Sequence, residues 1–128
     1  MESQRNTIAF DTNVLVSIAK TKKDVLEEAK KEFGTKSLLE VPEQVIAEVN
    51  ALERKGKAMK KACALAKKLL ELHGVKTKKI FARNADSALL AMARHGAIVI
   101  TNDRELKKRI KKSLGKIIEL SRGRLRTN

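Results

Sequence analysis

The chain has 128 residues, enough for one domain with a single hydrophobic core and too few for two. Hydrophobic residues make up 42% of the chain, which excludes a disordered protein. The excess of 29 Lys and Arg over 15 Asp and Glu gives a net charge of +14, which favours nucleic acid as a partner ahead of an anionic membrane surface. High solubility or a thermophile-like enrichment in Lys and Glu is the alternative explanation of this charge.

The single cysteine, Cys63, excludes an internal disulfide. It lies between two alanines in a helical pattern, which predicts a small buried side chain and a reducing compartment. The polar N-terminus does not resemble a signal peptide, and no apolar run is long enough to span a bilayer. We therefore expect a cytoplasmic protein without a membrane partner.

Apolar stretches of strand length alternate with stretches of helical periodicity along the chain. Strands are expected at residues 7–11, 37–41, 75–81, 97–101 and 116–120. Helices are expected after residue 11, from Asp24 to Gly34, after Pro42, from 57 to 73, from Asp86 and after Asp103. In the longest helix the spacing predicts an inward stripe made of Ala58, Ala62, Leu65, Leu69 and Leu72.

This alternation predicts an α/β fold with a central parallel sheet and helices on both faces, a three-layer α/β/α arrangement. The lysine-rich strand at 75–81 is expected near an edge of the sheet. We expect one domain over residues 1–120. Residues 121–128 carry no core pattern, so we expect them to form a basic tail that does not need to pack.

Four acidic residues occur where strands end or apolar helices run. Asp11 directly follows the first strand, Asp103 follows the strand at 97–101 after one residue, Asp86 opens a helix, and Glu48 lies inside an apolar helix. Each aspartate taken alone can be explained as a helix cap, and Glu48 can be explained as a solvent-facing residue. Right-handed crossovers would, however, bring the strand ends together at one edge of the sheet.

Four converging carboxylates raise one another's pKa, and they stay ionised together only when a cation compensates them. Mg²⁺ and Mn²⁺ prefer such oxygen ligands, and they can activate water and stabilise a leaving oxygen in phosphoryl chemistry. An acidic site on a basic protein therefore suggests carboxylates that hold metal and basic side chains that hold phosphates.

The motifs in order are D-x-N after the first strand, an internal Glu in the helix after V-P, D-S-A-L-L, and T-N-D-R-E-L after A-I-V-I. In this combination the chain resembles the PIN-domain nucleases over nearly its whole length. The lysine- and alanine-rich stretch at 55–66 looks most like the small archaeal branch related to ribosomal RNA processing PIN nucleases. Toxin PIN proteins of toxin–antitoxin pairs are the nearby alternative.

The resemblance implies a Mg²⁺- or Mn²⁺-dependent endoribonuclease. Its metal ligands, direct or through water, would be Asp11, Glu48, Asp86 and Asp103, with Asn13, Thr101 and Glu105 as supporting residues around them. Close relatives often carry an additional Asp beside the one at position 86, whereas this chain has Asn84 and Ala85 there. This departure thins the acidic cluster.

The expected substrate is RNA, possibly a ribosomal RNA precursor. Two alternatives stay open: a toxin ribonuclease with an antitoxin partner, and a non-catalytic RNA-binding assembly factor with a degenerate site. The long amphipathic helix is compatible with a homodimer.

Phosphate contacts are expected from basic residues on two helices and in the tail, although solvated surfaces would also explain them. These residues are Lys60, Lys61, Lys107, Lys108, Arg122, Arg124 and Arg126. The only aromatic residues are three phenylalanines, Phe10, Phe33 and Phe81, at positions with a core pattern. We therefore do not expect a platform for stacking bases. His73 and His95 each precede a glycine at a helix end and lack the spacing of a zinc site.

Overall fold

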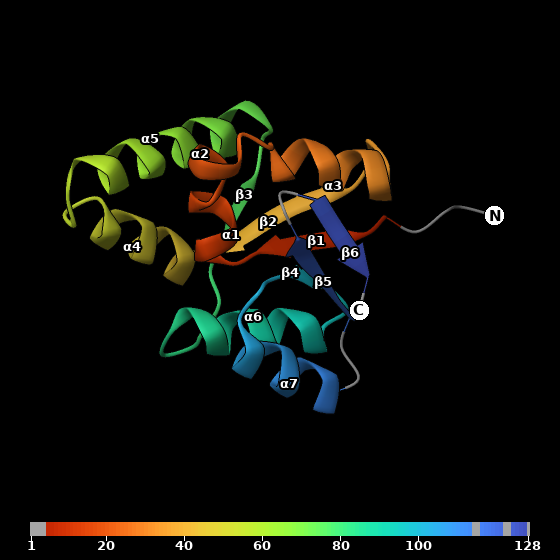
Figure 1. Cartoon of the computed structure of the whole chain (residues 1–128). Coiled ribbons are helices and arrows are strands. Elements are labelled where there is room, and N and C mark those ends of the chain that lie inside the picture. Colours follow the sequence, from red (N-terminus) through yellow and green to blue (C-terminus); the bar gives the residue numbers. More distant parts are fainter. Residues whose placement is uncertain (1–4, 114–115, 122–123, 128) are drawn as a thin grey trace.

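A six-stranded sheet forms the centre of the molecule, in the order β3-β2-β1-β4-β5-β6 (Figure 1). The computed structural model describes residues 5–113, 116–121 and 124–127. The strands are β1 (Thr7–Phe10), β2 (Leu38–Pro42), β3 (Lys76–Lys78), β4 (Ile98–Ile100), β5 (Lys116–Ser121) and β6 (Arg124–Thr127). All neighbours from β3 to β5 are parallel, whereas β6 pairs with β5 in the antiparallel direction.

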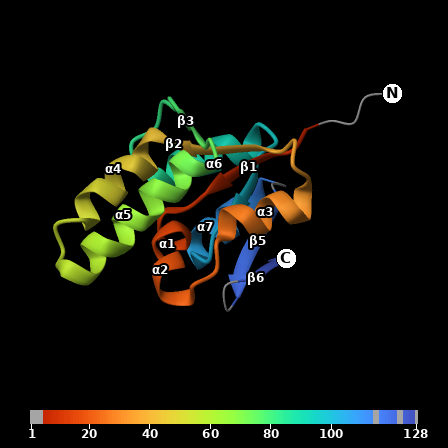
Figure 2. The same ribbon diagram turned by 90° about the horizontal axis from the view of Figure 1, so that it is seen from above.

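Helices cover both faces of this sheet (Figures 1 and 2). They are α1 (Thr12–Val16), α2 (Ile18–Thr21), α3 (Val25–Phe33), α4 (Glu43–Leu52), α5 (Lys57–Leu72), α6 (Ala85–Arg94) and α7 (Arg104–Lys112). In Figure 1, α2, α3 and α5 lie above the sheet, α1 and α4 lie beside its left end, and α6 and α7 lie below it. The predicted α/β fold with a parallel central sheet and helices on both faces is thus confirmed. In the described ranges, no helix has the length and apolar character needed to cross a membrane.

The two central strands are apolar on both faces, as the sequence predicts. Ile8, Ala9 and Phe10 of β1 and the whole of β4 are buried. Chain order reverses beside β1, because β2 flanks it on one side and β4, which comes much later in the chain, flanks it on the other. In open α/β sheets, ligands bind beyond the carboxyl ends of the strands at such a switch point.

Helix α5 buries a different face from the one that its leucines suggest. Cys63, Ala66 and Leu70 are buried, whereas Leu65 is 36% and Leu72 is 73% exposed. The two stripes differ by one residue, or about 100° around the helix. The buried stripe carries smaller side chains, and α5 packs against α1, α2 and α4, where small residues allow close approach. The predicted inward stripe was therefore wrong for Ala58, Leu65 and Leu72, although Leu69 packs against the core. The prediction of a buried Cys63 is confirmed.

The C-terminal segment also differs from the expected unpacked tail. Arg124–Thr127 forms β6, and Leu125 packs against the hydrophobic core. The polar and apolar alternation of this segment suits a strand at the edge of the sheet. Arg122 lies outside the described residues.

Candidate active site

Asp11 lies at the switch point between β1 and β4. The register pairs Phe10 with Ile100, so Asp11 and Thr101 leave the sheet side by side. The backbone N–H of Asp11 donates to the carbonyl of Ile100 at 3.1 Å. Asp11 is only 6% exposed, and its carboxylate accepts hydrogen bonds from the Thr12 N–H and from the Thr101 hydroxyl, each at 2.7 Å. Both hydrogen bonds favour the ionised form of a carboxylate that burial would otherwise neutralise.

Thr101 connects Asp11 to Asp103. Its hydroxyl oxygen accepts a hydrogen bond from the Asp103 N–H at 3.0 Å while it donates to Asp11. Asp103 is the N-cap of α7, since its Oδ1 accepts from the Leu106 N–H at 3.0 Å. Capping uses that oxygen atom of Asp103 and fixes the position of its carboxylate close to the end of β4.

Glu48 is attached to the same constellation through Thr12. The Thr12 hydroxyl donates to Glu48 Oε1 at 2.5 Å, which joins α4 to the start of α1. This role of Thr12 was not predicted from the sequence. The available signal was its place between Asp11 and Asn13, in a tripeptide where all three side chains are polar.

Asp86 does not cap its helix. The N-cap of α6 is Asn84, whose Oδ1 accepts from the Ser87 N–H at 2.8 Å, and Asp86 lies within the first turn. The cap of this helix therefore lies two residues before Asp86, the residue that was expected to open it. Capping therefore does not explain Asp86. Asn84, which departs from the pattern of close relatives, has a structural role as the cap of α6.

The four carboxylates repel one another in the folded protein. Burial raises the pKa of Asp11 above its usual value, and the charges of Asp86 and Glu48 raise it further, against the two hydrogen bonds. Burial also raises the pKa of Asp86, with additional contributions from Asp103 and Glu48, while the Arg109 guanidinium opposes them. Each of the four carboxylates thus interacts electrostatically with at least one other.

The donor set suits a hard divalent cation, because all four side chains offer carboxylate oxygens and their repulsion would be relieved by positive charge. In the part of the chain that the structure describes, no three His, Cys, Asp or Glu side chains lie close enough together to hold a metal ion. Mg²⁺ does not require such a cage, since it usually binds through one or two carboxylates and keeps several waters. The residues therefore fit a cation held partly through water.

The remaining predicted residues lie around this edge in different ways. Asn13 is exposed, and with Thr12, Glu48, Ala51 and Leu52 it lines a pocket of about 240 Å³. The side chain of Glu105 is 81% exposed and lies 4.0 Å from the Lys108 ammonium, which is a weak surface pair.

Basic residues flank the sheet from opposite layers. Lys60 and Lys61 are exposed on α5, and Lys107 and Lys108 lie on α7 (Figure 1). The backbones of Arg124 and Arg126 belong to β6. The cation that acts on Asp86 is Arg109 of α7, which is not among the predicted phosphate contacts.

Comparison with known proteins agrees with the α/β fold. The chain matches the model of the "PIN like domain" over residues 8–124. The structure titled "Structure of the PIN domain endonuclease Utp24" superposes with a TM-score of 0.76 at 22% identity, covering 95% of this chain and 90% of that one. A domain of a functionally unknown protein from Methanocaldococcus jannaschii DSM 2661 superposes with a TM-score of 0.60 at 15% identity, covering 91% of each chain. No curated protein matches the sequence significantly. Because the family match spans nearly all of the chain, the protein belongs to the PIN-like domain family.

Proposed function

We propose that this protein is a metal-dependent endoribonuclease whose reaction takes place at the Asp11 edge of the sheet. The observation that carries the proposal is the raised pKa of Asp11 and Asp86, which comes first from burial and then from the charges of neighbouring carboxylates, including Glu48 and Asp103. Helix capping explains Asp11, the N-cap of α1, and Asp103 in part, and it explains neither Asp86 nor Glu48. Perturbed carboxylates at a topological switch point are typical of a catalytic site.

The chain's own residues hold the carboxylates in place for this chemistry. Thr101 and the Thr12 N–H keep Asp11 oriented and favour its ionised form. The Thr12 hydroxyl donates to Glu48 and holds this carboxylate beside the start of α1. A bound Mg²⁺ or Mn²⁺ would supply Lewis acidity toward a phosphoryl oxygen and lower the pKa of a water ligand.

Neither histidine is placed to act as a general base at this edge. His73 Nε2 lies 2.8 Å from Asp24 at the far end of α5, and His95 Nδ1 lies 2.8 Å from the Ala91 carbonyl oxygen at the end of α6. This supports water activation by the cation in place of a histidine base.

RNA is the proposed substrate because the net charge of +14 favours a polyanion and the resemblance in sequence is to RNA-processing PIN nucleases. A ribosomal RNA precursor is the specific candidate. A non-catalytic RNA-binding factor is the second candidate, and the observation that favours it is that no three of the described acidic side chains gather closely enough to hold a metal. An antitoxin partner and a homodimer remain predictions.

Cleavage of end-labelled RNAs, including fragments of ribosomal RNA precursor, tests the proposal. We expect cleavage with Mn²⁺ or Mg²⁺, none with chelator, and none from Asp11→Asn under any condition. Glu71→Gln on the exposed surface of α5 removes a carboxylate outside the site and should cleave like wild type. Cleavage that persists in chelator, or that Asp11→Asn retains, would contradict the proposal. Binding without any cleavage would favour the non-catalytic candidate.

A further inference from the structure

Phe81 is fully exposed, although it is one of only three aromatic residues in the chain. Its position in an apolar stretch predicted a core residue, and that prediction was wrong. The segment around it is fixed, because Gln44 Nε2 donates to the carbonyls of Ile80 at 2.7 Å and Ala82 at 3.0 Å, on either side of Phe81. The fold thus holds this ring outward, where it loses the free energy of burial unless a partner covers it.

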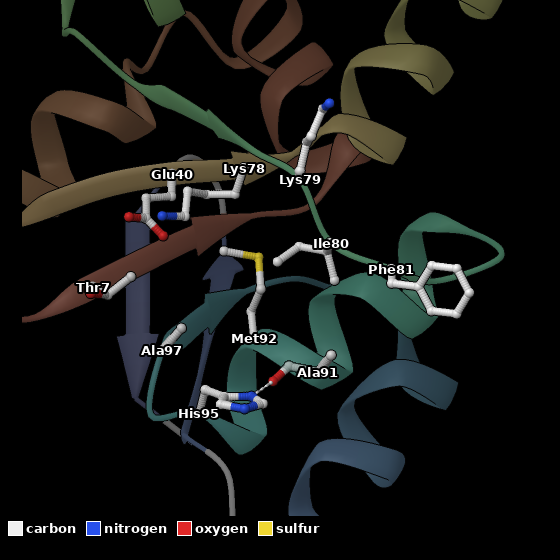
Figure 3. Close-up of a pocket in the computed structure, with 10 residues that line it drawn as sticks. All are labelled: Thr7, Glu40, Lys78, Lys79, Ile80, Phe81, Ala91, Met92, His95 and Ala97. Atoms are coloured by element: carbon white, nitrogen blue, oxygen red, sulfur yellow. Dashed lines mark hydrogen bonds between the residues drawn. The ribbon is translucent and has the colours of Figure 1, made fainter.

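Beside Phe81 lies a pocket of about 530 Å³, within the roughly 300–1,000 Å³ range of small-molecule sites. Its wall combines apolar side chains with charged ones (Figure 3). Ile80 and Met92 lie at its centre, Phe81 lies at one end, and Glu40 and Lys78 lie toward the other. The pocket is separate from the acidic edge, because two of its lining residues lie at the other ends of the same strands. Thr7 is the first residue of β1, which Asp11 follows, and Ala97 precedes β4, which Thr101 follows.

Glu40 is the feature of this pocket that favours a ligand. It lies in β2 between Ala9 and Lys76 of the neighbouring strands and is only 8% exposed. Within the described part of the chain, its carboxylate makes no hydrogen bond and no ion pair. Neither of its carboxylate oxygens is a fully buried atom, so both keep contact with the open pocket, where the N–H groups of a ligand can reach them. Lys78 points toward it in Figure 3 without forming an ion pair.

The donor and acceptor pattern at this end of the pocket selects among the nucleobases. Guanine alone presents two adjacent N–H donors, N1–H and N2–H, followed by the O6 acceptor on its Watson–Crick edge. A carboxylate can accept both N–H groups, and an ammonium can donate to O6. Adenine and cytosine place a ring nitrogen acceptor next to their amino group, and uracil places carbonyls on both sides of its N–H, so each would set an acceptor against Glu40.

We propose that this pocket binds an unpaired guanine of the RNA, with Glu40 and Lys78 reading its Watson–Crick edge and Phe81 stacking on a neighbouring base. The inference rests on the proposed function for its choice of RNA. It adds a preference for one base, read in a pocket apart from the acidic edge. Sequence-specific recognition of RNA commonly uses splayed bases stacked on aromatic side chains and read along these edges. The segment that carries Phe81 leads toward the acidic edge, because Asp86 follows Phe81 by five residues. Gln44, which holds this segment, lies one helical turn before Glu48 on α4.

The test measures binding of short labelled single-stranded RNAs in chelator, so that no cleavage occurs. One RNA has a single guanosine in a uridine background, a second has inosine at that position and lacks the N2 amino group, and a third is all uridine. Wild type should bind the guanosine RNA at least about five-fold tighter than the uridine RNA, with inosine between them. Glu40→Gln should bind all three equally, because an amide offers one acceptor in place of two.

Two further variants separate the base contact from general effects. Phe81→Leu should weaken binding of every RNA by about five-fold or more and retain the guanosine preference, because stacking is tolerant of sequence. Leu72→Ala changes an exposed apolar residue outside the pocket and should bind like wild type. Lys78→Met, at an exposed position, should lose part of the preference without any risk to folding. Unchanged binding by Phe81→Leu would overturn the stacking contact.

Equal binding of the guanosine and uridine RNAs by wild type would overturn the inference and leave the proposed function standing. Absence of RNA binding altogether would contradict the proposed function, and calorimetric titration with guanosine 5′-monophosphate would then test the pocket alone. Binding of this nucleotide in preference to adenosine 5′-monophosphate, lost in Lys78→Met, would support the pocket. No binding of either nucleotide would overturn it.

Discussion

The Thr101 hydroxyl donates to Asp11 Oδ2 at 2.7 Å and joins the ends of β1 and β4 across a separation of 90 residues in the chain. The same oxygen accepts the Asp103 N–H, so one buried hydroxyl aligns two of the four carboxylates. Thr101→Val keeps the shape and removes the hydroxyl. It should lower the free energy of unfolding by roughly 1–3 kcal/mol, because a buried carboxylate oxygen and an N–H lose their partners.

Urea denaturation measures this loss, and Thr101→Ser, which retains the hydroxyl, is the matched control. Thr101→Val should also raise the pKa of Asp11 further, since the hydrogen bond from Thr101 lowers it in wild type. Equal stability of the valine and serine variants would show that the hydroxyl contributes nothing to the site.

The raised pKa of Asp86 predicts a specific dependence of stability on pH. The metal-free folded protein binds this proton at a higher pH than the unfolded chain does, so the free energy of unfolding falls as pH rises from the ordinary value of 3.8 through the raised pKa. Below 3.8 the penalty is absent, and above the folded-state pKa it is complete. Asp86→Asn should therefore gain stability over wild type progressively across this window and keep the gain at neutral pH.

Denaturation of both proteins in chelator over a series of pH values measures this difference. Glu71→Gln, which removes an exposed carboxylate on α5, should track wild type throughout. A difference between wild type and Asp86→Asn that stays constant from acidic to neutral pH would mean that the charge of Asp86 is not under strain.

Asn84 and Asp86 lie in the same helical start and should respond in opposite directions. Asn84→Ala removes the N-cap of α6 and should cost about 1 kcal/mol of stability, within the usual range of roughly 0.5–2 kcal/mol. Asp86→Asn should stabilise the metal-free protein at neutral pH, because it removes one charge from a crowded cluster. Thermal melting in chelator compares them, and destabilisation by both would mean that the charge of Asp86 stabilises the first turn of α6 and is not under strain.

RNA binding should depend steeply on salt, because the protein carries a net charge of +14 and would release counterions from each phosphate it neutralises. Each phosphate contact adds roughly 0.7 to 0.9 to the slope of log affinity against log salt concentration. Replacing Lys60 and Lys61 together with Gln, or Lys107 and Lys108 together, should lower the slope in proportion to the number of phosphates that these lysines neutralise. Deleting residues 121–128 is not a suitable variant, since it would remove β6 and the packed Leu125.

The slope is measured from affinities over a series of salt concentrations in chelator. Glu71→Gln, which adds no phosphate contact, serves as the control for general charge effects. A slope near zero for wild type would contradict electrostatic binding of RNA.

Sequence reasoning located the parts of the site that are fixed by strand ends. Asp11 and Thr101 follow apolar runs that are buried on both faces, and parallel pairing of β1 with β4 then places them together. The link from Thr12 to Glu48 could not be predicted in this way, because it depends on how α4 is placed against α1. Hydrogen-bond partners between packed helices are set by tertiary geometry that periodicity does not contain.

The other differences have similar causes. Helix α5 carries two apolar stripes about 100° apart, and close packing against α1 and α2 selects the one with smaller side chains. Phe81 continues an apolar run, but β3 ends at Lys78 and Gln44 binds the backbone on both sides of the ring. Strand β6 is short and rich in arginine, so its sequence did not predict a strand that pairs with β5.

The claim that the four carboxylates act as one cation site is tested most directly by thermal melting of wild type and Asp86→Asn with chelator and with Mn²⁺. Asn84→Ala, which alters the same helical turn without removing a carboxylate, is the matched control. A cation that binds the folded state raises its stability by mass action, so wild type and Asn84→Ala should melt at a higher temperature with Mn²⁺. Asp86→Asn should start from a higher melting temperature in chelator and gain much less on adding Mn²⁺. Equal gains in all three proteins, or no gain in wild type, would contradict a metal site at this edge.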